Sequence, residues 1–304
     1  MNTNDSWPAN GQLQFFTGEQ HQPFYWNSGQ PAALLIHGFM GTPDELRPLA
    51  KQLHAEGWTV QGLLLPGFGP QLDTLFARQR SEWIDAVREA VIDLQKQHRP
   101  VMLVGYSMGA ALAMQVAAEI AVDGLVLLAP FWQIGTTKQR IIWHILKHIF
   151  PHFQPFKKAD FSDPQLQESL AKMMPDLDPA DPQIQAYLRQ LQVPARFVDQ
   201  VLDVGKAAEQ VTADISTPTH IIQGTEDETV TPQRTRQLLQ KLTVPVTYEE
   251  LETDHGLVKY GNPGFERMAQ SVLAYSYRLT VSEMNDQAVS QHPPRLSKLA
   301  ELSL

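Results

Sequence analysis

Short apolar runs and amphipathic stretches alternate along most of the chain. Continuous apolar runs at residues 32–36, 101–104 and 124–129 end at turn residues and predict strands that are buried on both faces. Between them, apolar residues recur at three- and four-residue spacing and predict helices with one buried face. One such stripe consists of Ile84, Val87, Val91 and Leu94. This alternation favours an α/β fold, with a mostly parallel central sheet and helices on both faces.

Local signals predict further elements and their ends. The run Thr42-Pro43-Asp44-Glu45 is typical of a capping box with proline at the first helical position, and we expect Ser81 to cap the next helix. A final helix is expected at residues 263–279. The remaining strands are expected at residues 13–16, as an early edge strand, and at residues 60–65, 219–222 and 246–248.

The alternation stops after Pro130. From residue 131 to about residue 214 the pattern is helical and broken by prolines, with helix-start signals at Asp163-Pro164 and Asp181-Pro182. A structureless loop of this length would be improbable, whereas a cap over the carboxyl edge of the sheet would cover the edge where open α/β sheets bind ligands. We therefore expect an inserted all-helical cap.

These patterns predict one core that is interrupted once. The expected core consists of residues 11–130 and 215–280, the helical cap insertion of residues 131–214, and a polar C-terminal tail of residues 281–304. The tail contains consecutive prolines, and we expect it to be mobile.

Composition removes several function classes. The chain has 304 residues, a net charge of -9 and no cysteine, which argues against a nucleic-acid partner and excludes thiolate chemistry. Its first residues lack the pattern of a secretory signal, and no apolar run reaches the roughly 20 residues of a membrane span, so we expect a cytoplasmic protein. No acid and histidine cluster has metal-ligand spacing, and Gly67-Phe68-Gly69 lacks the pattern of a phosphate loop, so we expect no metal and no cofactor.

The pentapeptide Gly105-Tyr106-Ser107-Met108-Gly109 carries the clearest chemistry. It follows a predicted strand and precedes a stretch of small helix-forming residues, the context in which G-x-S-x-G forms a nucleophile elbow. A sharp turn there lifts the serine hydroxyl clear of the backbone, and glycines two residues to either side remove side chains that would block it. Ser107 is therefore the candidate nucleophile of a serine hydrolase.

A serine nucleophile needs a base and a group that orients the base. His255 follows the last predicted strand, where a loop can bring its ring to Ser107, and we choose it over the nine other histidines. His220 lies within an apolar strand and is expected to be a core residue. The order nucleophile, acid, histidine is the one expected for this kind of site.

The orienting acid should follow the preceding strand, and residues 224–230 contain three carboxylates there. The Gly-x-x-Asp-x-x-Val spacing favours Asp227, with Glu226 and Glu228 as the alternatives. Asp254 is a weaker candidate, because a direct neighbour of His255 in sequence would have difficulty in reaching its Nδ1 atom.

Backbone N–H groups should stabilise the oxyanion. One expected donor is Met108, directly after the nucleophile. The other is Phe39, in the loop His37-Gly38-Phe39-Met40-Gly41 after the strand at residues 32–36, where Gly38 allows close approach of the backbone.

With these motifs the chain resembles the α/β-hydrolase superfamily, and the carboxylesterase and monoacylglycerol-lipase-like branch is the most similar. The segments that carry the resemblance are 34–42, 64–69, 105–109, 224–227 and 254–256. The resemblance implies a triad of Ser107, Asp227 and His255 and an oxyanion hole at Phe39 and Met108. It also implies that the cap sets specificity. Family members usually have Gly-His-Gly where this chain has Gly67-Phe68-Gly69.

The cap suggests an apolar substrate. Residues 138–150 form an amphipathic stretch with a basic polar face, which is consistent either with packing inside the cap, the interpretation we favour, or with transient contact with a membrane surface. We expect hydrolysis of medium- or long-chain acyl esters such as monoacylglycerols. The alternatives are a thioesterase, lactonase, peptidase or acyltransferase with the same triad, and a non-catalytic ligand-binding relative.

Overall fold

The computed structural model describes residues 15–132, 143, 147, 150–173 and 178–291. Within these residues, seven strands form one sheet in the order β1-β3-β2-β4-β5-β8-β9, and all neighbours are parallel except β1 and β3. The strands are β1 (Phe24–Trp26), β2 (Ala32–Ile36), β3 (Thr59–Leu63), β4 (Val101–Tyr106), β5 (Gly124–Leu128), β8 (Thr219–Gly224) and β9 (Val246–Leu251). The predicted mostly parallel sheet is confirmed.

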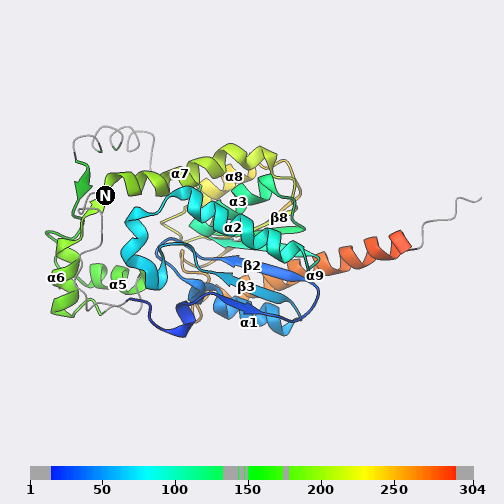
Figure 1. Cartoon of the computed structure of the whole chain (residues 1–304), viewed down its shortest axis with the longest axis horizontal. Helices are drawn as coiled ribbons and strands as arrows, with labels where there is room; N and C mark the ends of the chain where they lie inside the picture. Colours follow the sequence, from blue (N-terminus) through cyan, green and yellow to red (C-terminus); the bar gives the residue numbers. More distant parts are fainter. Residues whose placement is uncertain (1–14, 133–142, 144–146, 148–149, 174–177, 292–304) are drawn as a thin grey trace, which may run out of the picture.

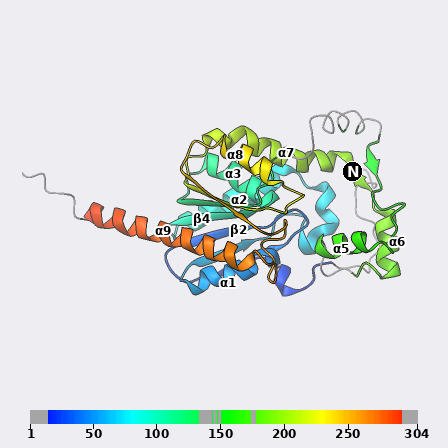
Figure 2. The ribbon, with the colours of Figure 1, turned by 180° about the vertical axis from the view of Figure 1, so that it is seen from behind.

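Helices cover both faces of this sheet (Figure 1). The side with α1 (Arg47–Ala55) and α9 (Phe265–Gln291) lies opposite the side with α2 (Arg80–Gln95) and α3 (Met108–Glu119), and the reverse view shows the same layers (Figure 2). The other helices of the described chain are α5 (Pro164–Met173), α6 (Pro182–Gln190), α7 (Ala195–Val211) and α8 (Pro232–Leu239), and the short 3-10 helices are η1 (Glu19–His21), η2 (Pro43–Leu46), η3 (Gly69–Ala77) and η4 (Thr212–Asp214).

The central strands are apolar throughout because both of their faces are buried. All five residues of β2 are buried, and successive side chains point to opposite sides. Leu34 and Ile36 belong to the hydrophobic core that includes α2 and α3, whereas Ala33 and Leu35 belong to the core that includes α1 and α9. The sheet thus separates two hydrophobic cores and holds the ends of its strands in fixed positions.

The sequence pattern predicted an edge strand at residues 13–16, but the structure does not have the edge strand there. Residues 13 and 14 lie outside the described chain, and Phe15 and Phe16 are not in a strand; Phe16 is buried with its ring against His21. The edge is formed by β1, whose three aromatic residues pair with β3. The guanidinium of Arg47 lies 4.3 Å from the centre of the Phe24 ring, a cation–π contact that local sequence spacing does not reveal.

Two helix starts differ from the prediction. The Thr42 hydroxyl accepts from the Asp44 N–H, but η2 precedes α1 and the Glu45 carboxyl group does not return to Thr42. Instead Glu45 accepts from the Gly38 N–H, so the expected capping box is absent. Ser81, the expected cap of the next helix, lies inside α2, which begins at Arg80 and has Gln79 as its N-cap.

The insertion contains the helices that its Asp-Pro signals predicted, together with a short ladder that they did not. Asp163 and Asp181 cap α5 and α6 by accepting from the backbone N–H two residues later. In addition, β6 (His152–Phe153) and β7 (Val193–Pro194) pair antiparallel, so the insertion is not all-helical. Two-residue strands are too short to produce a periodic signal.

Most of the amphipathic stretch 138–150 lies outside the described residues. Of its described side chains, the Trp143 indole N–H donates to Asp199 at 3.0 Å, and the Lys147 ammonium forms an ion pair with the same carboxylate at 2.8 Å. Both contacts attach this stretch to α7, which is consistent with packing inside the insertion.

The final helix is longer than predicted. Its apolar stripe ends near Leu279, but α9 continues to Gln291, eleven residues into the segment of residues 281–304 that was expected to be a tail. Figure 1 shows this part projecting beyond the core, and the side chains of Tyr277 and Val281 are exposed. Residues 292–304 lie outside the described chain.

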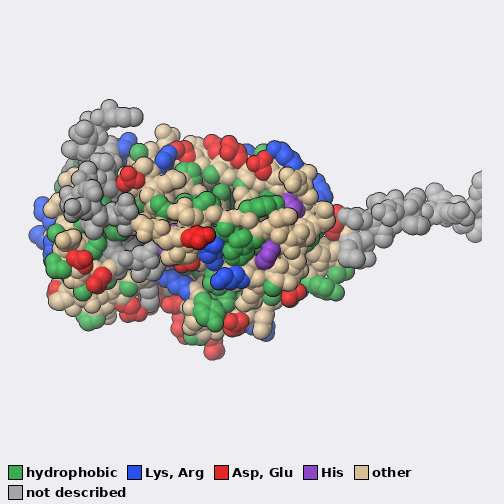
Figure 3. Space-filling view, turned by 60° about the horizontal axis from the view of Figure 1, so that its bottom comes forward, with side chains coloured by type: hydrophobic (Ala, Val, Ile, Leu, Met, Phe, Trp, Pro, Cys, Tyr) green, Lys and Arg blue, Asp and Glu red, His purple; other side chains and the backbone are tan. Residues whose placement is uncertain are grey.

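The described surface mixes charged and apolar groups. Figure 3 shows acidic, basic and hydrophobic side chains interspersed on one face of the molecule. In the described part of the chain, no helix is long and apolar enough to cross a bilayer.

Candidate active site

Ser107 lies at the turn between β4 and α3 in a strained conformation. Its φ of 51° and ψ of -114° fall in a region that residues with a side chain rarely adopt. Hydrogen bonds hold the turn: the Ser107 N–H donates to the Leu128 carbonyl at 2.9 Å, and the Ser107 carbonyl accepts from the N–H groups of Ala110 and Phe131. Such local strain is typical of functional sites, because it positions a side chain that relaxed backbone would not present.

The two flanking glycines are sterically required. A Cβ atom at Gly105 would lie 2.5 Å from the Ala110 Cα atom, and one at Gly109 would lie 2.2 Å from the Ile36 carbonyl oxygen. Both distances are far shorter than van der Waals contact. The G-x-S-x-G pattern therefore has a direct steric cause in this structure.

Three side chains that are distant in sequence meet at this turn. His255 Nε2 lies 3.1 Å from Ser107 Oγ, and His255 Nδ1 lies 2.7 Å from Asp227 Oδ2. An ionised carboxylate can only accept, so Nδ1 carries the proton and Nε2 is free to accept the serine proton. The geometry is that of a nucleophile, a base and an orienting acid.

The Asp227 carboxylate is fully buried and held from several sides. Besides His255, it accepts from the side-chain amide of Gln223 at 3.0 Å and from the N–H groups of Thr229 and Val230 at 2.9 and 2.8 Å. The last two contacts close a turn within residues 224–230 and give the Asp-x-x-Val spacing its physical reason. A carboxylate held by this many donors is fixed in orientation, and it fixes the imidazole in turn.

The other candidate acids lie elsewhere. Glu226 and Glu228 are exposed, and neither is the hydrogen-bond partner of His255. Asp254 accepts from the Gly256 N–H and from the Asn262 side chain, each at 2.9 Å, and so orders the loop rather than the ring.

His220, as expected, lies in the core, where Thr247 and Ser271 bond its two nitrogens.

The loop after β2 lies against the nucleophile. A Cβ atom at Gly38 would lie 3.1 Å from the Tyr106 ring and 3.4 Å from the Ser107 Cβ atom, so the backbone here approaches the elbow closely. The next residue is Phe39. Met108 is the first residue of α3, where an N–H group has no acceptor within the helix. Both expected donors therefore lie beside Ser107.

His37 has a structural role that sequence reasoning did not assign. The Leu65 N–H donates to His37 Nε2 at 3.1 Å, so the ring is neutral there and its Nδ1–H donates to the Gly38 carbonyl at 2.8 Å. Burial lowers the pKa of His37 to about 4. The ring thus connects the loop after β2 to the loop after β3 and holds the Gly38 peptide in place.

Glu45 is a second residue whose position the sequence pattern misassigned. Its Oε2 atom accepts from the Gly38 N–H at 3.0 Å, and its side chain lies at the wall of the cavity that contains Ser107. Burial raises the pKa of Glu45 to about 7. Together His37 and Glu45 bond the carbonyl and the N–H group of one residue, Gly38, directly before Phe39.

Two cavities of different character share Phe39 in their linings. The polar cleft, of about 720 Å³, contains Ser107 and His255; its other lining residues are Gly38, Phe39, Glu45, Tyr106, Ser169, Glu226, Glu228, Thr229, Asp254, Gly256, Lys259 and Asn262. The apolar cavity has a volume of about 290 Å³. It is lined by Phe39, Met40, Phe76, Phe153, Pro155, Phe156, Leu170, Leu188, Leu191, Val193, Phe197, Val198, Val201 and Leu202.

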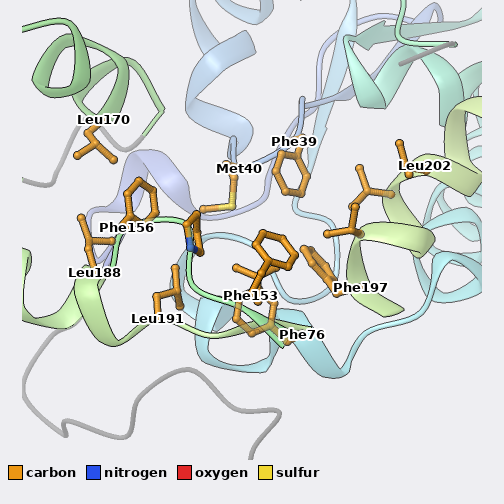
Figure 4. Close-up of a pocket in the computed structure, with 14 residues that line it drawn as sticks. Phe39, Met40, Phe76, Phe153, Phe156, Leu170, Leu188, Leu191, Phe197 and Leu202 are labelled. Atoms are coloured by element: carbon orange, nitrogen blue, oxygen red, sulfur yellow. The ribbon is translucent and has the colours of Figure 1, made fainter. Parts of the chain in front are cut away.

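Figure 4 shows the aromatic and aliphatic side chains of the apolar cavity. Phe39, Met40 and Phe76 come from the core, and the rest of the lining comes from residues 153–202 of the insertion. Among the residues that the structure describes, no group of three acids or histidines could hold a metal ion.

Comparison with known proteins identifies the family of the chain. Residues 29–257 match the serine aminopeptidase S33 family. The thermostable monoacylglycerol lipase of Bacillus sp. strain H-257 is 33% identical over 96 residues, which cover 32% of this chain and 38% of the lipase. The carboxylesterase of Bacillus subtilis strain 168 is 21% identical over 241 residues, which cover 79% of this chain and 85% of the esterase.

A solved structure described among metagenome-derived lipolytic enzymes has the same fold. It superposes with a TM-score of 0.65 at 20% identity and covers 87% of this chain and 100% of its own length. The sheet order, the helices on both faces and this superposition confirm the expected α/β-hydrolase fold. The chain therefore belongs to the serine aminopeptidase S33 family and has the α/β-hydrolase fold.

Proposed function

We propose that the protein hydrolyses medium- or long-chain carboxylic esters, such as monoacylglycerols, at Ser107. The observation that carries this proposal is the position of Phe39, which lines both the apolar cavity and the cleft that contains Ser107. An acyl chain in the apolar cavity would leave its ester carbonyl beside the serine and its alcohol in the polar cleft. The monoacylglycerol lipase and carboxylesterase among the relatives support the same substrate class.

The proposed reaction uses the geometry of the three side chains. His255 accepts the Ser107 proton as the serine oxygen attacks the ester carbonyl, and Asp227 stabilises the imidazolium that forms. The N–H groups of Phe39 and Met108 bind the oxyanion. The alcohol leaves with a proton from His255, and water then cleaves the acyl-enzyme by the same route to release the fatty acid.

We propose that residues 131–214 form the cap that selects the acyl chain. Every described side chain that lines the apolar cavity is apolar, so this part of the lining offers no side-chain hydrogen-bond partner to a polar acyl group. Each methylene that leaves water for such a site contributes about 0.8 kcal/mol. Longer chains should therefore react faster until the cavity is full.

A series of p-nitrophenyl esters from acetyl to dodecanoyl tests this proposal. We expect kcat/KM to rise with chain length and Ser107→Ala to lower kcat by about 10⁶-fold. Equal kcat/KM for the acetyl and octanoyl esters would contradict the assignment of the apolar cavity. Normal turnover by Ser107→Ala would contradict the nucleophile.

The alternatives share the acyl-enzyme and differ in the groups that enter and leave. An octanoyl thioester, a lactone and a peptide anilide, compared with octanoylglycerol at equal concentration, separate thioesterase, lactonase and peptidase activity. A new ester product in the presence of a second alcohol would identify acyl transfer. A fluorophosphonate probe that fails to label Ser107 would favour a non-catalytic ligand-binding protein.

A further inference from the structure

The Glu45 carboxyl group is built into the wall of the polar cleft. Glu45 belongs to η2, and its Oε2 atom accepts from the Gly38 N–H at 3.0 Å, one residue before Phe39. It lines the same cleft as Ser107 and His255. The carboxyl group therefore has a fixed place close to the position where the ester is cleaved.

The backbone around this carboxyl group is shaped to accommodate it. A Cβ atom at Gly41 would lie 2.0 Å from Glu45 Oε2 and 2.4 Å from its Cδ atom. Any side chain at position 41 would displace the carboxyl group. The loop from Gly38 to Glu45 thus encloses this group, and a long flexible side chain becomes a fixed acceptor.

Glu45 has acceptor capacity left for a ligand. A carboxyl group offers about four acceptor positions. Among the described residues, the Gly38 N–H is the one hydrogen-bond donor to this group. The remaining positions are available to a donor inside the cleft.

The other acids of the cleft differ from Glu45. Glu226 and Glu228 are exposed to solvent, and Asp254 is bonded to Gly256 and Asn262 within its own loop. Glu45 alone among the four is bonded to the loop that carries Phe39. Lys259 also lines the cleft and places a positive charge near Glu45. This single charge is fewer than the four carboxyl groups of the cleft.

We propose that Glu45 determines which alcohol the enzyme releases, by accepting a hydrogen bond from a free hydroxyl of the leaving group. Esters of polyols should then react faster than esters of plain alkanols with the same acyl chain. The apolar cavity cannot supply this preference, because it contacts the acyl half. This inference rests on the proposed ester hydrolysis at Ser107.

The test compares 1-octanoylglycerol with ethyl octanoate below their solubility limits, because the two share an acyl-enzyme and differ in the leaving alcohol. We expect the intact protein to favour the glycerol ester in kcat/KM. Glu45→Met, of similar length but without an acceptor oxygen, should lower this preference about tenfold, the value of one well-placed hydrogen bond. Glu45→Gln retains an acceptor for the Gly38 N–H and should lower it less.

Glu89→Gln is the control, because it removes an exposed carboxylate on α2 that does not line the cleft, and we expect its preference to equal that of the intact protein. If Glu45 only supported the loop, Glu45→Met would lower both rates by one factor and leave their ratio unchanged. That result, or equal rates for the two esters in the intact protein, would overturn this inference alone. Failure to cleave either ester would overturn the proposed function as well.

Discussion

The polar cleft and the apolar cavity share Phe39 in their linings but are built in opposite ways. The cleft is formed by loops at the carboxyl ends of strands, with Ser107 after β4, Asp227 after β8 and His255 after β9, and directed hydrogen bonds hold its side chains. The cavity is formed mainly by the insertion, and its side chains are held by non-directional apolar packing. Under the proposed function, the reaction and the choice of acyl chain therefore depend on different parts of the chain and on different forces.

This difference predicts how substitutions should act. A hydrogen bond is lost when its atoms move by less than an ångström, so a change among the catalytic side chains should slow all substrates alike. An apolar wall tolerates small movements but responds to volume, so a change in the cavity should alter the preference among substrates. The largest expected effect lies in the cleft.

Asp227→Asn should lower kcat by about 10⁴-fold, because an amide group cannot stabilise the imidazolium and favours the wrong tautomer of His255. The measurement is steady-state turnover of acetyl and octanoyl p-nitrophenyl esters, and we expect the same factor for both. Asp254→Asn is the control, since Asp254 bonds to its own loop, and it should lose less than tenfold. A chain-length-dependent loss in Asp227→Asn would break the separation between cleft and cavity.

The three side chains that meet in the cleft could be predicted because strand and turn patterns constrain them. Gly105 and Gly109 have steric reasons that the motif already implies, and Asp227 closes a turn whose spacing is visible in the sequence. Glu45 could not be assigned in this way. Its spacing from Thr42 is that of a capping box, whereas its actual partner is Gly38, which no local rule selects.

The cavity was predictable only in outline. An apolar cap follows from the composition of residues 131–214, but the side chains that face the cavity depend on how the insertion packs on the core. The β6–β7 ladder has two residues in each strand, and α9 beyond Leu279 has no apolar stripe, so neither produces a periodic signal. Non-directional packing leaves little trace in local sequence.

The two regions should also contribute differently to the pH dependence of stability. The described lining of the cavity contains no titratable group, so we expect the contribution to come from the side of the cleft. The pKa of His37 is lowered from 6.5 to about 4, so the unfolded chain binds the extra proton and stability is lost as the pH falls from 6.5 through 4. The lowered pKa of His37 corresponds to a loss of about 3 kcal/mol in the free energy of unfolding over this pH range. His37→Asn, which retains a donor and an acceptor, should remove this part of the loss, as measured by urea unfolding at each pH.

Glu45 should change the stability of the protein with pH in the direction opposite to His37. Its raised pKa means that the folded protein binds the proton more tightly, so the contribution to stability is present below pH 4.5 and is lost as the pH rises through about 7. Glu45→Gln should therefore remove a loss of stability that occurs as the pH rises from 4.5 through about 7, which is opposite in sign to the loss that His37→Asn removes. If both variants follow the pH dependence of the intact protein, these side chains do not keep their buried environment in solution.

Val201→Phe is expected to have the smallest effect, and it tests the cavity directly. The larger ring would occupy space near Phe197 and Leu202, so kcat/KM for dodecanoyl esters should fall about tenfold while that for acetyl esters changes little. Ile92→Phe is the matched control, because Ile92 is an exposed apolar residue on α2, outside the cavity. An equal loss for acetyl and dodecanoyl esters would mean that α7 acts on Ser107 through the core, since Gln115 of α3 bonds to the Val204 carbonyl of α7. In that case the cavity wall and the catalytic side chains would be one mechanical unit, and acyl preference could not be changed without loss of rate.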